Sequence, residues 1–111
     1  MITRLKISRS ATGILNNRYK GLRHFFTPNI ILRNALMFSL NNGDLYDDDE
    51  PNTGGSEFQI STLLGSKARL YELLLNQYYR KILSDSDLKN VMSYHMEQGL
   101  RHDEFESIFK N

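Results

Sequence analysis

The sequence predicts a mainly helical fold with one short N-terminal β-strand, built from a strand-helix-helix half and a helical C-terminal half. The first residues alternate with a period of two, later apolar residues recur every three or four positions, and an acidic, turn-rich stretch separates the two halves. The chain has 111 residues, of which 40% are hydrophobic, as is typical of one folded domain over 1–111. Its parts are a basic segment (3–43), an acidic loop (44–57) and a helical half (58–111).

The first two elements are a strand over residues 3–8 and a helix over about 11–24. In the strand, Leu5 and Ile7 alternate with Arg4 and Lys6, so one face is apolar and the other basic. An apolar stripe predicts the helix, with Ser8 or Ser10 as its cap: Ala11, Ile14, Leu15, Tyr19 and Leu22. Arg18 falls within this stripe, so we expect it to form an ion pair, extend toward solvent or face a partner chain.

The next helix, over about 28–41, is apolar almost all round. Thr27 and Pro28 are typical of a helix start, and Asn41, Asn42 and Gly43 end the pattern. A core formed by so short a chain would not cover every face of this helix, so the sequence predicts self-association.

The C-terminal half predicts a short strand or extended segment within 57–64, then helices over about 67–83 and 87–98. Asp85 or Ser86 would cap the second helix, and Gly99 would follow its end. A last short helix would begin near Asp103.

Charge is strongly segregated although the net charge is only +1. Residues 1–43 carry +7 with no acidic residue, residues 44–57 carry −6 with no basic residue, and residues 58–111 are neutral. A basic segment of this kind favours a polyanion as partner, because Lys and Arg that neutralise phosphates bind nucleic acid of any sequence. The competing interpretation is a solvated basic face on an ordinary α+β domain.

The order basic strand, helix, turn, helix resembles the ribbon-helix-helix plan, in which strands from two subunits pair and enter the major groove of DNA. The sequence therefore predicts DNA binding through the basic residues of the N-terminal half. The candidate contact residues are Arg4, Lys6, Arg9, Lys20, Arg23 and Arg33.

No catalytic residue, metal site or cofactor is predicted, and the chain is interpreted as a non-enzyme. Cysteine is absent, and the acidic run from Asp47 to Glu50 lacks the spacing of an EF-hand, so we interpret it as a solvated loop. His95 lies on an apolar helical face and is expected to be a hydrogen-bonded core histidine. With neither a membrane-spanning stretch nor a signal peptide, the sequence favours a cytoplasmic protein without membrane contact.

Several short stretches together resemble the DndE family of DNA sulfur modification proteins. They are Arg4-Leu5-Lys6-Ile7-Ser8, Thr27-Pro28-Asn29-Ile30 with Arg33 and Ala35, Gly55-Ser56-Glu57-Phe58, and Thr62-Leu63-Leu64-Gly65. The resemblance implies a non-catalytic subunit of the DNA phosphorothioation system, which self-associates as a tetramer and binds duplex DNA, preferring nicks, through surface lysines. It also implies partners that resemble a PAPS reductase and an SMC-type ATPase. This chain departs from that pattern, because its lysines are few and arginines carry most of the N-terminal charge, so the resemblance leaves open which basic residues contact DNA.

Three alternatives remain open at the level of sequence. A ribbon-helix-helix transcriptional regulator or antitoxin would bind one operator with high specificity. A scaffold would use the basic surface to dock on an acidic protein. A nuclease would use the acidic residues of 44–57 with Mg²⁺.

Overall fold

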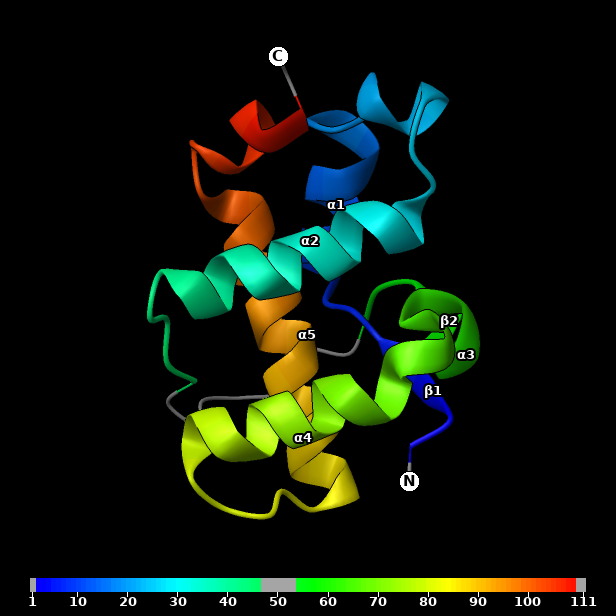
Figure 1. Cartoon of the computed structure of the whole chain (residues 1–111). Coiled ribbons are helices and arrows are strands. Elements are labelled where there is room, and N and C mark those ends of the chain that lie inside the picture. The colour runs from blue at the N-terminus through cyan, green and yellow to red at the C-terminus, as the bar shows by residue number, and fades with distance from the viewer. Residues whose placement is uncertain (1, 47–53, 110–111) are drawn as a thin grey trace.

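The computed structural model describes residues 2–46 and 54–109 as a helical body with a small two-stranded sheet at one side (Figure 1). The strands are β1 (Arg4–Lys6) and β2 (Glu57–Gln59). The α-helices are α1 (Arg9–Asn17), α2 (Pro28–Asn41), α3 (Ile60–Leu63), α4 (Ala68–Tyr79) and α5 (Asp85–Arg101). Three short 3₁₀ helices are η1 (Leu22–His24), η2 (Gly65–Lys67) and η3 (Phe105–Phe109). Within these residues, no helix combines the length and the apolar character needed to cross a membrane.

The sheet pairs β1 with β2 of the same chain, antiparallel, with Leu5 opposite Phe58. Beyond β1 the pairing continues, because the Ile7 amide donates to the Ser56 carbonyl at 3.0 Å. Gly55 passes so close to this segment that an added Cβ would lie 2.2 Å from the Ser8 carbonyl oxygen. The strand prediction is confirmed over three residues, but its partner is intramolecular. The sheet therefore differs from the ribbon-helix-helix plan, in which the paired strands belong to two subunits.

Helix α1 begins earlier and ends earlier than the predicted helix over 11–24. Ser8 is the N-cap, and its Oγ accepts a hydrogen bond from the Ala11 amide at 2.9 Å. The helix ends at Asn17, and the chain continues through turns into η1. Asn16, Asn17 and Gly21 are weak helix formers, which explains why the apolar stripe did not sustain a helix to residue 24.

Helices α2 and α5 cross at the centre of the molecule (Figure 1). The sequence predicted that Gly99 follows the end of this helix, but the structure places it inside α5. Its backbone contacts α2 so closely that an added Cβ would lie 1.9 Å from the Ala35 carbonyl oxygen. Gly99 is thus required for the close approach of two helices, a role that sequence alone confuses with a helix stop. The N-cap is Ser84, whose Oγ accepts from the Asp87 amide.

The predicted bounds of α2 are confirmed, and most of its apolar surface is covered within one chain. Ile31, Leu32, Ala35 and Leu36 are fully buried, and Phe38 packs edge-on against Phe105 of η3. The exposed large apolar side chains of the described residues lie outside α2, at Phe25, Leu45, Leu70, Leu73, Ile82 and Ile108. Helix α5 and η3 thus cover much of α2 within one chain, while Ile30, Met37 and Phe38 are only partly buried. Self-association remains a prediction.

The segment after β2 also departs from prediction. Residues 60–63 turn into the short helix α3 instead of remaining extended. Helix α4 ends at Tyr79, four residues before the predicted end, because Arg80 adopts a left-handed conformation with φ 57° that stops the helix. The expected last helix is the 3₁₀ helix η3.

Replacing Gly99 with alanine should destabilise the protein, because its Cβ would collide with backbone atoms of Ala35. We expect a loss of about 1–3 kcal/mol in the free energy of unfolding, measured by urea denaturation. Gly13 is the matched control, since nothing lies within 4 Å of its added Cβ. Gly13→Ala, in the middle of α1, should gain about 0.5–1 kcal/mol. A G99A protein as stable as the parent would contradict the close crossing.

Candidate nucleic-acid interface

Two groups of exposed basic residues flank opposite ends of α5. The first, the strand cluster, consists of Arg4 and Lys6 on β1 with Lys89 and Asn90 of α5, around a shallow pocket of about 200 Å³. Glu57 of β2 belongs to the same pocket and pairs with Arg4 at 3.5 Å. Both partners of this pair are well exposed, so its contribution to stability is small.

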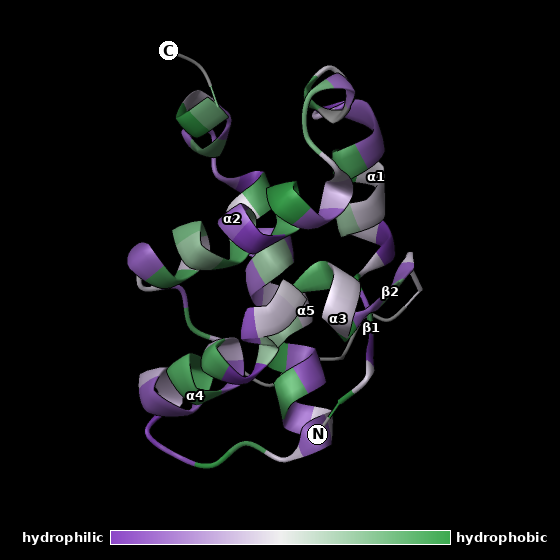
Figure 2. Ribbon diagram, turned by 45° about the vertical axis from the view of Figure 1, so that its right-hand side comes forward, coloured by the Kyte–Doolittle hydropathy of each residue, from purple (hydrophilic) through white to green (hydrophobic). Residues whose placement is uncertain are grey.

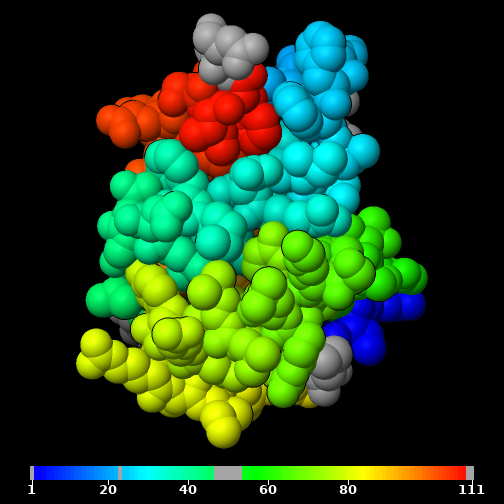
Figure 3. All heavy atoms as spheres, viewed as in Figure 1, coloured from blue at the N-terminus to red at the C-terminus, as the bar shows by residue number. Residues whose placement is uncertain are grey.

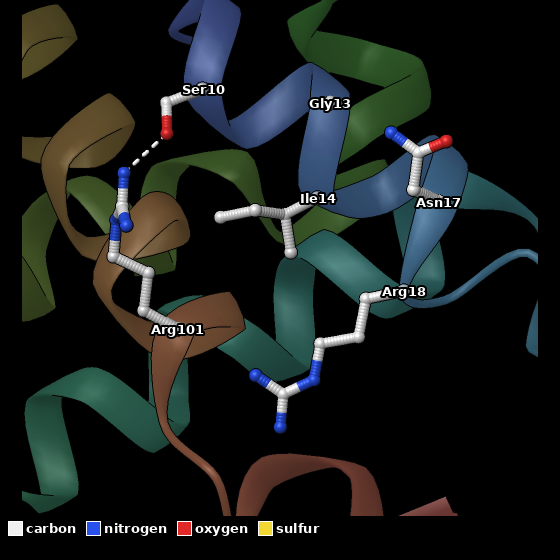
Figure 4. Close-up of a pocket in the computed structure, with 6 residues that line it drawn as sticks. All are labelled: Ser10, Gly13, Ile14, Asn17, Arg18 and Arg101. Atoms are coloured by element: carbon white, nitrogen blue, oxygen red, sulfur yellow. Dashed lines mark hydrogen bonds between the residues drawn. The ribbon is translucent and has the colours of Figure 1, made fainter.

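The second group, the helix groove, runs between α1 and the end of α5 (Figure 4). It is an open groove of about 520 Å³ lined by Ser10, Gly13, Ile14, Asn17, Arg18 and Arg101. The two arginines project on either side of Ile14, and Gly13 leaves its part of α1 without a side chain. No acidic side chain lines this groove.

Both arginines of the groove pair with an acidic residue. Glu97 accepts from Arg101 Nε at 3.0 Å and also accepts from the Ser8 hydroxyl, while Arg101 donates to the Ser10 hydroxyl. This chain links α5 to the N-terminus of α1 and fixes the position of the Arg101 side chain. On the other side, the Arg18 guanidinium lies 3.7 Å from the Asp103 carboxylate. Its central carbon lies 5.5 Å from the centre of the Tyr19 ring.

The six residues predicted from sequence are distributed unevenly around these groups. Arg4 and Lys6 form the strand cluster, Arg9 is exposed at the start of α1, and Lys20 is exposed in the turn after α1. The side chain of Arg23 lies outside what the structure describes. Arg33 differs from the others, because it is half-buried in α2.

Arg33 joins α2 to the end of α3. Its Nε donates to the Leu63 carbonyl at 2.5 Å, and one terminal nitrogen donates to the Thr62 carbonyl at 3.0 Å. Asn29 donates to the same Thr62 oxygen at 3.2 Å. These bonds satisfy carbonyl groups left open at the end of the short helix. Arg33 therefore has a structural role, and we do not include it among the candidate DNA contacts.

The sequence argument overlooked Lys89 and Arg101. Both lie in the half of the chain that is neutral by count, so charge segregation gave no reason to choose them. Arg18 had been noted only as a misfit, and it does form an ion pair, one of the outcomes expected for it. The spacing of Glu97 and Arg101, four residues apart on one helix, was the one available signal, and it indicates only a helix pair.

A second polar arrangement is buried beneath α2, α4 and α5. Ser39 donates to Asp44 at 2.8 Å and lies 2.7 Å from His95 Nδ1, while His95 Nε2 lies 2.5 Å from the Tyr79 hydroxyl. His102 contacts the same Asp44 carboxylate at 2.9 Å. Serine, histidine and aspartate here resemble the members of a hydrolase triad, but Ser39 and His95 are fully buried and the serine proton is directed at the aspartate. The network is structural, and the prediction that His95 is a hydrogen-bonded core residue is confirmed.

Burial sets the ionisation of this network. It lowers the pKa of His95 to about 4, against a smaller opposing effect of the Asp44 charge, and it raises the pKa of Tyr79 to about 12. Burial also pushes the pKa of Asp44 upward, but hydrogen bonds from His102 and Ser39 outweigh it and leave that pKa below its usual value. His95 is therefore neutral at pH 7, with its Nδ1 proton toward Ser39 and its Nε2 accepting from Tyr79.

The described residues of the acidic loop, 44–46 and 54–57, do not form a metal site. Asp44 belongs to the buried network, and Glu57 pairs with Arg4. Among residues 2–46 and 54–109, no three His, Asp or Glu side chains come together in a way that could hold a metal ion. The run Asp47 to Glu50 lies outside the described residues, so its interpretation as a solvated loop stays a prediction.

Comparison with known proteins connects this fold to DNA modification. The family model of the DNA sulphur modification protein DndE matches residues 4–106. This chain belongs to the DndE family. A crystal structure of DndE from Escherichia coli B7A involved in DNA phosphorothioation modification is similar, with a TM-score of 0.73 and 26% identity, covering 90% of this chain and 95% of that one. A glycine-to-lysine mutant of DndE gives a TM-score of 0.70, also at 26% identity, covering 90% of this chain and 94% of that one. The search among curated proteins finds no match.

The stretches that resemble the DndE family meet one another in space. Asn29 and Arg33 of α2 contact the carbonyl groups of Thr62 and Leu63. In the same way, the stretch from Arg4 to Ser8 pairs with the stretch from Gly55 to Phe58. The stretches that resemble the family thus form two internal contacts of the fold.

Arg33→Met should lower the free energy of unfolding by about 1–3 kcal/mol, because two backbone carbonyls lose their donors. The same variant should bind duplex DNA as tightly as the parent in a gel-shift assay, since this guanidinium is engaged inside the protein. Loss of DNA binding without loss of stability would return Arg33 to the list of contacts.

Acid should destabilise the protein between pH 6.5 and 4 through His95. The folded protein holds the pKa of His95 near 4, whereas its ordinary value is 6.5, so the unfolded chain binds more protons in this window and stability falls as pH falls. The difference corresponds to about 3 kcal/mol in urea unfolding. Asp44 contributes separately, below its ordinary value of 3.8.

His24, an exposed histidine of η1, supplies the control. The variant His24→Gln should retain the acid-dependent loss, and His95→Gln should largely abolish it. An NMR titration that finds His95 protonating near pH 6.5 would refute the buried neutral state.

Proposed function

We propose that this DndE-family chain is a non-catalytic accessory subunit of the DNA phosphorothioation system that holds duplex or nicked DNA by its backbone for partner enzymes. The observation that supports the proposal best is the placement of two exposed basic groups, the strand cluster and the helix groove, at opposite ends of one rigid helix. The strand cluster presents Arg4, Lys6 and Lys89 beside Glu57, and the helix groove presents Arg18 and Arg101 beside Ile14 and small residues. Exposed cations of this kind suit the phosphate oxygens of the DNA backbone.

The distance between the two groups fits an extended ligand. Asn90 and Arg101 are eleven residues apart on α5, which corresponds to about 17 Å along the helix axis. One strand of duplex DNA advances about 3.4 Å per nucleotide, so the two groups are separated by about five nucleotide steps. A duplex lying along this side of the molecule would contact Arg4 and Lys6 at one end and Arg18 and Arg101 at the other.

The ion pairs within the surface are compatible with such a role. Arg4, Arg18 and Arg101 each have an acidic neighbour, but all three side chains are at least one-third exposed. Exposed pairs of this kind are weak, so a phosphate can replace the carboxylate or share the cation with it. Arg9, Lys20 and Arg23 complete the proposed contact set, together with the residues of the strand cluster and the helix groove.

The assembly around this subunit is also part of the proposal. A homotetramer would place several such surfaces on one particle and raise the effective affinity for a long polyanion. The partners would resemble a PAPS reductase, which mobilises sulfur, and an SMC-type ATPase. The subunit itself would work in the cytoplasm without a cofactor.

Lys6→Ala and Lys20→Ala should each weaken binding to duplexes of any sequence. Each should also reduce the slope of log affinity against log salt by about one, because one phosphate contact is lost. The measurement is a gel shift over a salt series with intact and nicked duplexes. Lys81→Ala, an exposed lysine after α4, is the matched control and should change neither quantity.

Other results would point to other functions. An unchanged salt slope in both variants would remove these lysines from the interface. Binding to one operator with a specificity ratio of about 10³ or more would instead identify a transcriptional regulator. Metal-dependent nicking of the duplex by the purified protein would identify a nuclease.

A further inference from the structure

The outer side of α4 exposes more apolar surface than a helix of a closed domain needs. Leu75 is the one fully buried residue of this twelve-residue helix. Leu70 and Leu73 are 59% and 47% exposed, and Ile82, just beyond the helix, is 91% exposed. Hydrophobic residues recur along α4 in Figure 2, and α4 forms the lower front of the molecular surface in Figure 3.

A groove follows this apolar side. It has a volume of about 270 Å³ and is lined by Met37 of α2 with Lys67, Leu70, Tyr71 and Leu74. Residues 67, 70, 71 and 74 follow the spacing of one helical stripe, so the groove runs along α4 and not across it. Such a groove between two helices has the shape that accepts a third helix by its apolar side.

Basic side chains lie at both ends of α4. Lys67 and Arg69 lie at its start, and Arg80 and Lys81 follow its end; all four are exposed. Glu72 is the one acidic residue between positions 58 and 84, and it pairs with Arg69 at 3.0 Å. The apolar centre is thus bordered by a net positive rim.

We propose that this face of α4 docks an amphipathic helix of a partner protein whose apolar side is flanked by acidic residues. The leucines would fit the apolar side of that helix, and the basic rim would select its acidic flanks. A second copy of this chain fits poorly, because two copies meeting through this face would oppose like charges. DNA fits poorly as well, because two exposed leucines at the centre would leave its phosphates without donors.

This docking site shares no lining residue with the strand cluster or the helix groove. In Figure 1, α4 crosses the front of the molecule, whereas α1 lies behind α2. A variant of α4 can therefore test the docking site without touching the DNA contacts.

The probe is a labelled helical peptide with leucines at three- and four-residue spacing and glutamates on both flanks. A matched peptide carries lysines in place of the glutamates. By fluorescence anisotropy, the glutamate peptide should bind with a Kd below about 1 mM, and the lysine peptide should bind at least about tenfold more weakly. Amide NMR shifts on titration should be confined to α4 and Met37.

Three variants assign the binding to the face. The double variant Leu70→Ser, Leu73→Ser should weaken binding of the glutamate peptide at least about tenfold, because the apolar contacts are lost. It should remain folded, because both leucines are exposed. Lys67→Glu with Lys81→Glu should reverse the preference between the two peptides. Phe25→Ser, which changes an exposed apolar residue outside α4 and its groove, is the control and should bind the glutamate peptide like the parent.

The proposal fails if the glutamate peptide does not bind at about 1 mM, or if both peptides bind equally. It also fails if the two serine substitutions lower the mass of a self-associated particle in light scattering, since that would identify a second copy as the occupant. A loss of DNA affinity in the same variant would assign the face to DNA. Unchanged DNA binding with lost peptide binding supports the docking site and leaves the function proposed above independent of it.

Discussion

The close crossing of α2 and α5 is the contact on which the rest of the structure depends. Gly99 brings the two backbones together at Ala35, so α5 cannot shift along α2 without a collision. Because α5 carries Lys89 near one end and Arg101 at the other, this crossing also fixes where both basic groups lie. A contact between two backbones and no charged side chain thus determines the geometry of the proposed DNA surface.

The stretches that resemble the DndE family form contacts inside the fold. Gly55 is needed because the Ser8 carbonyl leaves no room for a side chain, and Arg33 is needed because two carbonyls at the end of α3 require donors. Constraints of this type depend on backbone geometry, which few residue types can satisfy. Phosphate contacts are less demanding, since any exposed Lys or Arg near the right place serves. A resemblance in residues that form internal contacts therefore identifies the fold more securely than it identifies the DNA contacts.

The sequence predicted elements where local and tertiary preferences agree. Thr27 and Pro28 mark the start of α2, and the structure begins and ends that helix as expected. His95, alone on an apolar face, is buried and hydrogen-bonded as predicted. Prediction from the sequence failed where the role of a residue depends on a contact far away in the chain, as the role of Gly99 depends on Ala35. The partner of β1 was missed for the same reason, because no local pattern shows that residues 57–59 return to residues 4–6.

Counting charge along the chain selected the basic residues of the N-terminal half and missed cations of the C-terminal half that lie beside them in the structure. Arg101 joins the helix groove only because α5 ends beside α1, and its partner Glu97 holds it there through Ser8. The basic side chains of this surface are exposed or half-exposed, so each of their ionic contacts is weak and sensitive to salt. The apolar side of α4 has the opposite physics, since burial of leucine in a protein contact changes little with ionic strength. In the proposed function, the salt-sensitive contacts would release DNA while the apolar contact keeps a protein partner, which is the property that a platform for other enzymes requires.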